Sequence, residues 1–335
     1  MSVLRRAVLL AGLLGIAAGA GSPGPARGEP VAVHDFRGKA LSLAAPARRI
    51  VCLIESALSG IFMLGEAQRV VGVATSVYRG DVFPYYAALD ERIGKKTLPA
   101  PGNWDFVSIE GVLALRPDLV ILWAQQSEAI AALEERGIPV FGVFIRRLED
   151  VYREIEALGA LTGNPARARE VVDFTRSEIE RLRGRAEALP RERRPSVYFM
   201  WAQGDLETSC GGSTVQDLIE LAGGRNVCEA LEAEHAIVNL ERLIAWNPQV
   251  IVLWPNERRD PADILRDPRW RSIAAVREGR VHELPEVFLC DLWTLKFPYP
   301  VKLLHRWLYP GEAGGIDAAR EKGRMLRALY GRSLP

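Results

Sequence analysis

Short apolar runs alternate with amphipathic segments along most of the chain, and this alternation predicts the order of strands and helices. Buried parallel strands are continuous apolar runs, whereas a helix facing a core carries apolar residues at three-and-four spacing. In the first half, the apolar runs are RRIVCLI, RVVGVAT, DLVILW and IPVFGVF, and the helical patterns ESALSGIFMLGE, SIEGVLALRP and SEAIAALEERG lie between them. This rhythm predicts a parallel sheet with helices on both faces.

One long helix is predicted near the middle of the chain, from Asn164 to Leu189. Asn164 can cap its amino end, and Pro165 then occupies the first helical position, where a missing N–H is tolerated. The stripe of Ala168, Val171, Val172, Ile179 and Leu182 places one apolar face against a core, and Pro190 ends the helix. At about 1.5 Å per residue the helix spans roughly 35 Å. We expect it to connect two lobes.

The same rhythm restarts after this helix, and one segment is visibly repeated. SIEGVLALRPDLVILW (108–123) and NLERLIAWNPQVIVLW (239–254) align without gaps at a spacing of 131 residues. The sequence therefore predicts an α/β fold of two Rossmann-like lobes joined by a single long helix, with a ligand cleft between the lobes. The expected parts are an N-terminal lobe (31–150), connecting helices (151–190) and a C-terminal lobe with closing helices (194–335).

Bulk composition is that of a soluble globular protein, with 48% hydrophobic and 25% charged residues. A net charge of +1 and the lack of a clustered basic face give no basis for binding nucleic acid. We expect a monomer.

The amino terminus has the pattern of a secretory signal peptide. Arg5 and Arg6 precede fourteen apolar or small residues, Ala7 to Ala20, and a Gly/Pro-containing segment follows. This run is short for a membrane span, so we expect residues 1–26 to be removed, with cleavage after Ala20 or Ala26, and the mature protein to reside in the periplasm. The alternative is an uncleaved membrane anchor.

Export would make the cysteines potential disulfide partners. Cys52, Cys210, Cys228 and Cys290 allow three pairings if all four are bonded, and the sequence does not choose among these pairings and four free thiols. Their spacing fits no zinc motif.

The repeat carries one glutamate in each copy, Glu110 and Glu241, each two residues after a capping residue, Ser108 or Asn239. Each glutamate thus lies in the first helical turn, where the helix dipole favours a negative charge. Helix-end electrostatics is one explanation. The other is a pair of anchors, one per lobe, for a partner that carries arginines.

The order of these motifs resembles the periplasmic substrate-binding proteins of ABC importers for ferric siderophores, haem and cobalamin. The resemblance rests on RRIVCLIESALSGIFMLGEAQRVVGV, the two repeat copies, the long helix, STVQDLIELAGGRNV and REGRVHELP, and it covers roughly residues 46–310. It implies two lobes bridged by a rigid helix, with ligand bound between them. It also implies that Glu110 and Glu241 dock into arginine pockets of the membrane permease.

Candidate ligand contacts lie in loops after the predicted strands, where α/β folds bind ligands. They are Glu55, Tyr78, Arg79, Trp104, Trp123, Arg146, Trp201, Gln203, His235, Trp254, Trp293, Lys296 and Tyr299. Aromatic walls with a few cations suit a bulky, partly apolar, anionic ligand such as a metal chelate. The alternatives are core packing for Trp123 and Trp254, and solvated surface charges for Arg79 and Arg146.

The four scattered histidines form no cluster that would hold a bare metal ion, so no metal site and no cofactor are expected. We therefore expect a transport receptor without catalysis, which binds a ferric siderophore or a haem-type iron chelate. Molybdate, tungstate or cobalamin are alternative ligands on the same fold. A secreted hydrolase or metalloenzyme is the rival of another class, but the sequence has no G-x-S-x-G or H-E-x-x-H motif. A haem or metal chaperone that never docks to a permease is a third possibility.

Overall fold

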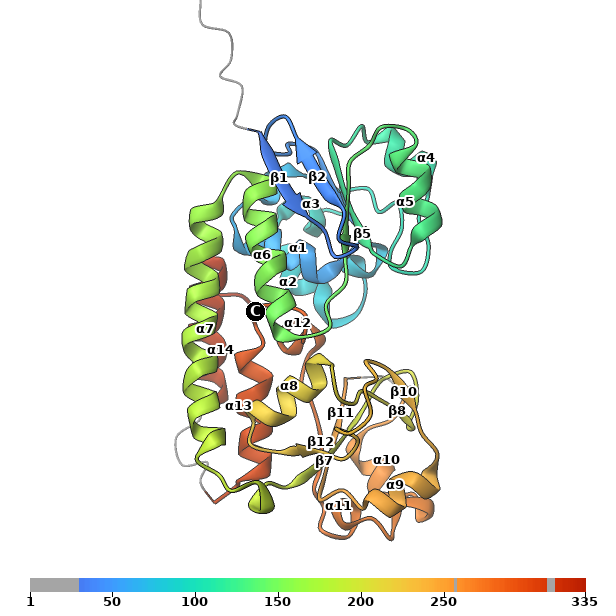
Figure 1. Cartoon of the computed structure of the whole chain (residues 1–335), viewed down its shortest axis with the longest axis vertical. Coiled ribbons are helices and arrows are strands. Elements are labelled where there is room, and N and C mark those ends of the chain that lie inside the picture. Colours follow the sequence, from blue (N-terminus) through green and yellow to red (C-terminus); the bar gives the residue numbers. More distant parts are fainter. Residues whose placement is uncertain (1–29, 256–257, 312–316) are drawn as a thin grey trace, which may run out of the picture.

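Two four-stranded parallel sheets form the two lobes of the molecule, as the repeat predicts (Figure 1). The computed structural model describes residues 30–255, 258–311 and 317–335, so the predicted signal peptide lies outside the described residues. The strands are β1 (Val31–His34), β2 (Ala40–Leu43), β3 (Ile50–Cys52), β4 (Val70–Val73), β5 (Leu119–Trp123), β6 (Val140–Val143), β7 (Ser196–Met200), β8 (Glu207–Thr208), β9 (Arg225–Asn226), β10 (Ala236–Ile237), β11 (Val250–Leu253) and β12 (Val281–Glu283).

The strand order gives both lobes the same topology. It is β4-β3-β5-β6 in the N-terminal lobe and β12-β11-β7-β9 in the C-terminal lobe. In each sheet the second strand in sequence pairs with one side of the first strand, and the third and fourth strands are added on its other side. The reversal therefore lies between β3 and β5 in the first lobe, and between β7 and β11 in the second. Such a switch point is where open α/β sheets leave a crevice at the carboxyl ends of their strands.

Helices cover both faces of each sheet. They are α1 (Glu55–Met63), α2 (Phe83–Leu89), α3 (Glu91–Gly94), α4 (Ile109–Ala114), α5 (Ser127–Glu134), α6 (Leu148–Thr162), α7 (Pro165–Glu187), α8 (Thr214–Leu221), α9 (Leu240–Trp246), α10 (Pro261–Arg266), α11 (Ala274–Arg277), α12 (Val287–Cys290), α13 (Pro298–Leu308) and α14 (Ala318–Tyr330). Among the described helices none is long and apolar enough to cross a bilayer.

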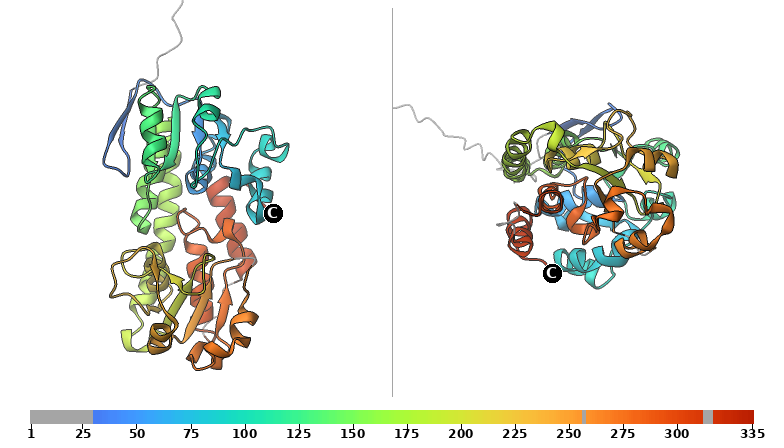
Figure 2. Two further views of the ribbon diagram at one scale, coloured as in Figure 1. Left: turned by 90° about the vertical axis from the view of Figure 1, so that its right-hand side faces the viewer. Right: turned by 90° about the horizontal axis from the view of Figure 1, so that it is seen from below.

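The predicted long helix is α7, and it runs along one side of both lobes (Figures 1 and 2). The Asn164 side chain accepts a hydrogen bond from the backbone N–H of Arg167, and Pro165 is the first helical residue, which confirms the predicted start. Its apolar stripe is buried, and α7 packs against α6 of the first lobe and against α8 and α13 of the second. The helix thereby ties the two sheets into one body.

The chain returns to the first lobe after β12. The Val287 N–H donates to Asp81 at 2.8 Å, and the hydroxyls of Tyr330 and Ser59 lie 2.6 Å apart. Helix α14 lies beside α7, and its last turn reaches α1 (Figure 1). The C-terminal segment therefore contacts both lobes.

Several short elements were not predicted. The aromatic-rich segment after β4 contains α2 and α3, and α10 and α11 form between β11 and β12. Pro84 and Pro261 lie in the first turns of α2 and α10, where proline favours helix initiation. These helices have too few turns to show a clear apolar period.

Candidate ligand-binding site between the lobes

Three tryptophans follow the strands at the two switch points. Trp123 ends β5 in the first lobe, while Trp201 and Trp254 come directly after β7 and β11 in the second. Because parallel strands end at the same edge of a sheet, these positions bring the indole rings to the region where the lobes face each other. The repeat thus places Trp123 and Trp254 at equivalent points.

A fourth tryptophan joins the two lobes' aromatic residues. The Trp293 ring centroid lies 6.1 Å from that of Trp123 and 6.2 Å from that of Trp201, with which it is stacked. The centroids of Trp201 and Trp254 are 5.1 Å apart, and Phe144 lies edge-on to Trp123 at 5.3 Å. These rings form a continuous aromatic surface that crosses between the lobes, in which Trp201 is buried and Trp123, Trp254 and Trp293 are partly exposed. Together with Glu55 and Asp291, the four tryptophans are called the interlobe site below.

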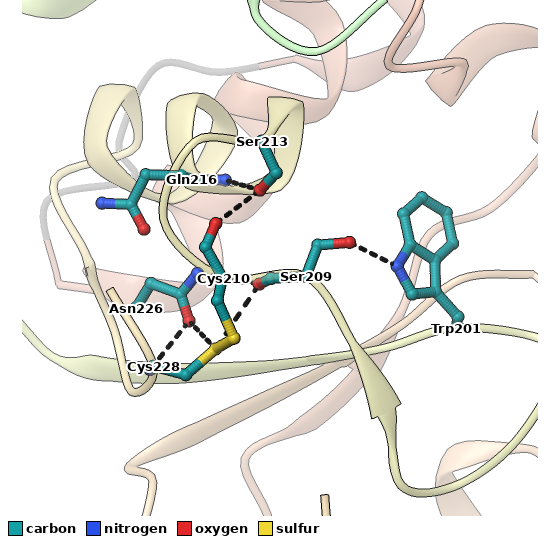
Figure 3. Close-up of a disulfide and its surroundings, with 7 residues drawn as sticks. All are labelled: Trp201, Ser209, Cys210, Ser213, Gln216, Asn226 and Cys228. Carbon is teal, nitrogen blue, oxygen red and sulfur yellow. Dashed lines mark hydrogen bonds between the residues drawn. A yellow bond between two sulfur atoms is a disulfide. The ribbon is translucent and has the colours of Figure 1, made fainter. Parts of the chain in front are cut away.

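A disulfide holds the loop that positions Trp201. The Trp201 Nε1–H donates to the Ser209 hydroxyl at 2.7 Å, and Ser209 precedes Cys210, which is bonded to Cys228 (Figure 3). Asn226 Nδ2 donates to the Ser209 carbonyl at 3.0 Å, which fixes this loop from the other side. The structure therefore has neither a complete pairing nor four free thiols: Cys210 is bonded to Cys228, while Cys52 and Cys290 are free and buried.

Two glutamines shape the wall of the first lobe. The Trp123 Nε1–H donates to Gln125 Oε1 at 3.0 Å, while Gln126 accepts from the Trp123 backbone N–H. Gln126 Nε2 also donates to the Asn103 carbonyl at 2.9 Å, which holds the loop that carries Trp104. Trp104 itself is 62% exposed and lies on that loop.

Carboxyl groups lie in the same region as the tryptophans. Burial raises the pKa of Glu55, the charge of Asp291 raises it further, and the charge of Lys296 lowers it. Burial also raises the pKa of Asp291, while Lys296 acts in the opposite direction. Glu55 begins α1, directly after β3, whereas Asp291 precedes Trp293. The polar groups of the interlobe site are therefore two carboxyls, with the charge of Lys296 beside them.

Of the predicted cations, Lys296 interacts with the charges of Glu55 and Asp291 in the interlobe site. Lys296 is fully buried, and its Nζ donates to Ser59 at 2.9 Å and lies 4.0 Å from the Phe288 ring centroid. Burial lowers the pKa of Lys296 to about 8. Arg79 and Arg146 are exposed, and the Arg146 guanidinium lies 6.0 Å from the Phe144 ring.

The remaining predicted contacts have other partners or positions. The Tyr78 hydroxyl donates to the Leu98 carbonyl at 2.7 Å, and Tyr299 borders a small cavity beside α7 and α14. His235 lies 2.8 Å from Glu207, and Gln203 is exposed. Five of the thirteen predicted contacts thus belong to the interlobe site: Glu55, Trp123, Trp201, Trp254 and Trp293.

Asp291 was missed by the sequence reasoning, as were the residues that fix the lobes to each other. The Arg147 guanidinium donates to Asp217 Oδ1 at 2.7 and 3.0 Å, and the Leu148 N–H donates to Asp217 Oδ2. On the other edge, Tyr85 donates to Glu286. The only signal for these groups was a charged or polar residue next to a predicted helix start, which is common on any surface.

Glu110 and Glu241 are exposed in equivalent places. The Ser108 hydroxyl accepts the Gly111 N–H at 3.1 Å, and Asn239 Oδ1 accepts the Arg242 N–H at 2.8 Å, so both predicted caps are present. Helices α4 and α9, which carry the two glutamates, lie on the side of the molecule away from α7 (Figure 1). Within the described ranges no group of three His, Cys, Asp or Glu side chains could hold a metal ion.

Comparison with known proteins supplies the family. A family model described as "Periplasmic binding protein" matches residues 50–287. The molybdate-binding protein MolA of Haemophilus influenzae is 25% identical over 80% of this chain and 82% of its own. The vitamin B12-binding protein of Yersinia pseudotuberculosis is 24% identical over 62% of this chain and 69% of its own.

Solved structures share the fold. MolA bound to molybdate superposes with a TM-score of 0.78 at 22% identity, covering 91% of this chain and 99% of that chain. Helicobacter pylori CeuE in a nickel–histidine complex gives a TM-score of 0.77 at 17% identity, covering 91% and 97%.

Proposed function

Because the chain belongs to the periplasmic binding protein family, we propose that it is the exported receptor of an ABC importer and captures a metal complex in the interlobe site. Residues 1–26 serve as its signal peptide in this proposal, and the receptor acts without catalysis. The observation that carries the proposal is the aromatic surface of Trp123, Trp293, Trp201 and Trp254, which both lobes contribute at their switch points.

The aromatic surface favours a ligand with a broad organic face. Indole rings stack on flat or apolar groups and bury a large area for each side chain. An iron chelate of the siderophore or haem type offers such a face. A small oxyanion is held instead by convergent N–H groups and cations, whereas Arg79 and Arg146 are exposed and Lys296 is buried under other side chains. Molybdate and tungstate are therefore the weaker candidates.

Cobalamin is a second candidate that one observation supports. Glu55 and Asp291 bring carboxyl groups, which accept hydrogen bonds when ionised and repel an anionic ligand. A neutral complex edged with amide N–H donors suits such groups better than a polyanionic chelate. Several relatives of the chain are vitamin B12-binding proteins.

A tryptophan-fluorescence titration tests the ligand class. Mature protein is titrated with ferric siderophores, haem, cobalamin, molybdate and tungstate. We expect saturable quenching by one of the metal chelates, with the Trp293→Phe variant giving a smaller signal and weaker binding. A matched Trp246→Phe variant, which changes an indole on α9 outside the site, should bind like the wild type. Saturation by the oxyanions alone would refute the chelate proposal.

Delivery is proposed to use Glu110 and Glu241 as anchors for arginines of the permease. The Glu110→Arg/Glu241→Arg variant should lose uptake and permease binding while its ligand affinity stays unchanged, because both side chains lie outside the interlobe site. Reversal of two other exposed glutamates, Glu128 and Glu187, is the control for net charge. Normal uptake by the first variant would exclude the docking role.

A further inference from the structure

In both copies of the internal repeat, the matched pattern begins two residues before the residue that caps the helix. Phe106-Val107 precedes the cap Ser108, and Ile237-Val238 precedes the cap Asn239, at the same spacing of 131 residues. Phe106 is 55% exposed and Ile237 is 77% exposed, whereas both valines are partly buried. Each lobe thus presents a large exposed apolar side chain four residues before its exposed glutamate.

The backbone fixes both apolar residues in place. Val107 forms an antiparallel bridge with Gly102, and the Phe106 carbonyl accepts the Asn103 N–H at 2.8 Å. Ile237 pairs with Glu207 in the β8–β10 ladder. Phe106 therefore lies in a turn closed by a β-bridge, Ile237 lies in a short β-ladder, and in both copies a helix cap follows two residues later. Because the backbone that carries them is already ordered, little of this chain has to be ordered when a partner binds, which lowers the entropic cost of association.

Both apolar residues and both glutamates are exposed. No ion pair of Glu110 or Glu241 occurs in the part of the chain that the structure describes. Few large apolar side chains are exposed among the described residues, and they include this matched pair. Both copies lie on the side of the molecule away from α7 (Figure 1). An apolar group beside a charge on ordered backbone is typical of an interaction surface.

We infer that Phe106 with Glu110, and Ile237 with Glu241, form two matched docking points that bind the periplasmic face of the permease. This inference rests on the proposed function and adds an apolar contact to each proposed ion pair. Two equivalent points on one chain fit a partner that presents two equivalent sites, as a dimer of one subunit does. The charges orient the encounter, and the buried apolar side chains slow dissociation.

The test compares binding of variants to the permease reconstituted in nanodiscs. Phe106→Asn/Ile237→Asn keeps both glutamates and should weaken binding at least tenfold, mainly through faster dissociation. Leu265→Asn is the matched control, because Leu265 is an exposed apolar residue outside the repeated pattern and should leave binding unchanged. Thermal unfolding and intrinsic fluorescence of each purified variant establish that it is folded.

The outcomes separate the two proposals. If Phe106→Asn/Ile237→Asn binds like the wild type while Glu110→Arg/Glu241→Arg does not bind, the apolar contact is refuted and the glutamate docking stands. If the glutamate reversal also binds normally, the docking assignment itself fails. Binding of the wild type to protein-free lipid vesicles that is lost in Phe106→Asn/Ile237→Asn would assign the apolar pair to the membrane and overturn the inference.

Discussion

Among single residues, Glu154 in α6 is the clearest departure from ordinary packing. Its side chain is fully buried, and neither carboxylate oxygen has a hydrogen-bond partner in the protein. Burial, together with the nearby charges of Asp291 and Asp150, raises its pKa well above the usual value. A carboxyl group in this state is neutral in the folded protein at a pH where it would be charged in the unfolded chain.

Replacement of Glu154 by leucine should therefore stabilise the protein at neutral pH. Because the pKa of Glu154 is higher in the folded protein than in the unfolded chain, its contribution to the free energy of unfolding is fully present below the unfolded-state pKa of about 4.3. That contribution is lost as the pH rises through the folded-state pKa. We expect Glu154→Leu to gain about 1–3 kcal/mol at pH 7 in urea unfolding, since an unsatisfied buried polar group is removed. The gain should shrink toward pH 4.

The control for this prediction is Glu156→Leu on the same helix. Glu156 is 48% exposed and lies 3.6 Å from Arg176 in a solvated ion pair, so its replacement should change stability little at either pH. A loss of stability in Glu154→Leu at pH 7, in folded protein, would mean that the carboxyl group has a partner that burial and geometry do not reveal.

At the scale of elements, the packing of α6 against α7 depends on a glycine. A Cβ atom added at Gly159 would lie 2.4 Å from the Ala168 Cβ and 3.3 Å from the Asn164 carbonyl oxygen. Gly159→Ala must therefore push the two helices apart, and we expect a loss of about 1–3 kcal/mol in thermal or urea unfolding. The two helices join at a tight turn, so they cannot adjust independently.

Gly184 in α7 supplies the matched control for that substitution. An added Cβ there meets no atom within 4 Å, and the position is exposed in the last turns of the helix. Gly184→Ala should raise stability by up to about 1 kcal/mol, because alanine favours helix more than glycine does. Equal effects of the two substitutions would show that helix propensity, and not the close approach, decides the outcome at Gly159.

The disulfide is the second element-scale feature open to test. It closes a loop across a sequence separation of 18 residues and anchors the segment that positions Trp201 (Figure 3). We expect Cys210→Ser/Cys228→Ser to lose about 3 kcal/mol of stability and to bind ligand more weakly. Reductant should lower the melting temperature of the wild type and leave that of the variant unchanged. A reductant effect of equal size on both proteins would assign it to another part of the molecule.

The elements that sequence predicted best are those with many turns or a repeated pattern. Helix α7 has a cap, a proline and a long apolar stripe, and its observed bounds differ from the prediction by two residues at the C-terminal end. The tryptophans at the strand ends were predicted because the end of each apolar run can be located in the sequence. Asp291 and Asp217 were not, because their roles depend on which loops the topology brings together, and no local pattern encodes that.

At the scale of the whole molecule, the contacts that the structure describes between the lobes include three sets that fix one lobe relative to the other. The first set is the hydrogen bond from Arg147 to Asp217. The second set joins Tyr85 to Glu286, and Asp81 to the backbone N–H of Val287. The third is the buried hydrogen bond from Lys296 to Ser59. Helix α7 runs along one side of both lobes (Figure 2). Since Trp123 and Trp201 belong to different lobes, the lobe orientation sets the spacing of the aromatic surface.

A substitution of Asp217 tests how the lobe orientation affects ligand binding. The Asp217 carboxylate accepts hydrogen bonds from the Arg147 guanidinium and from the Leu148 N–H. Asp217→Ala therefore removes this hydrogen bond between the lobes and leaves the Leu148 N–H at the start of α6 without its acceptor. We expect a stability loss of about 2 kcal/mol, faster amide exchange around residues 145–150, and at least fivefold weaker ligand binding. Arg147→Ala should have a smaller effect, because the Asp217–Leu148 bond remains. If Asp217→Ala exchanges faster at α6 but binds ligand with unchanged affinity, then α7 and the interior contacts suffice to hold the tryptophans, and the edge bond stabilises the fold without shaping the site.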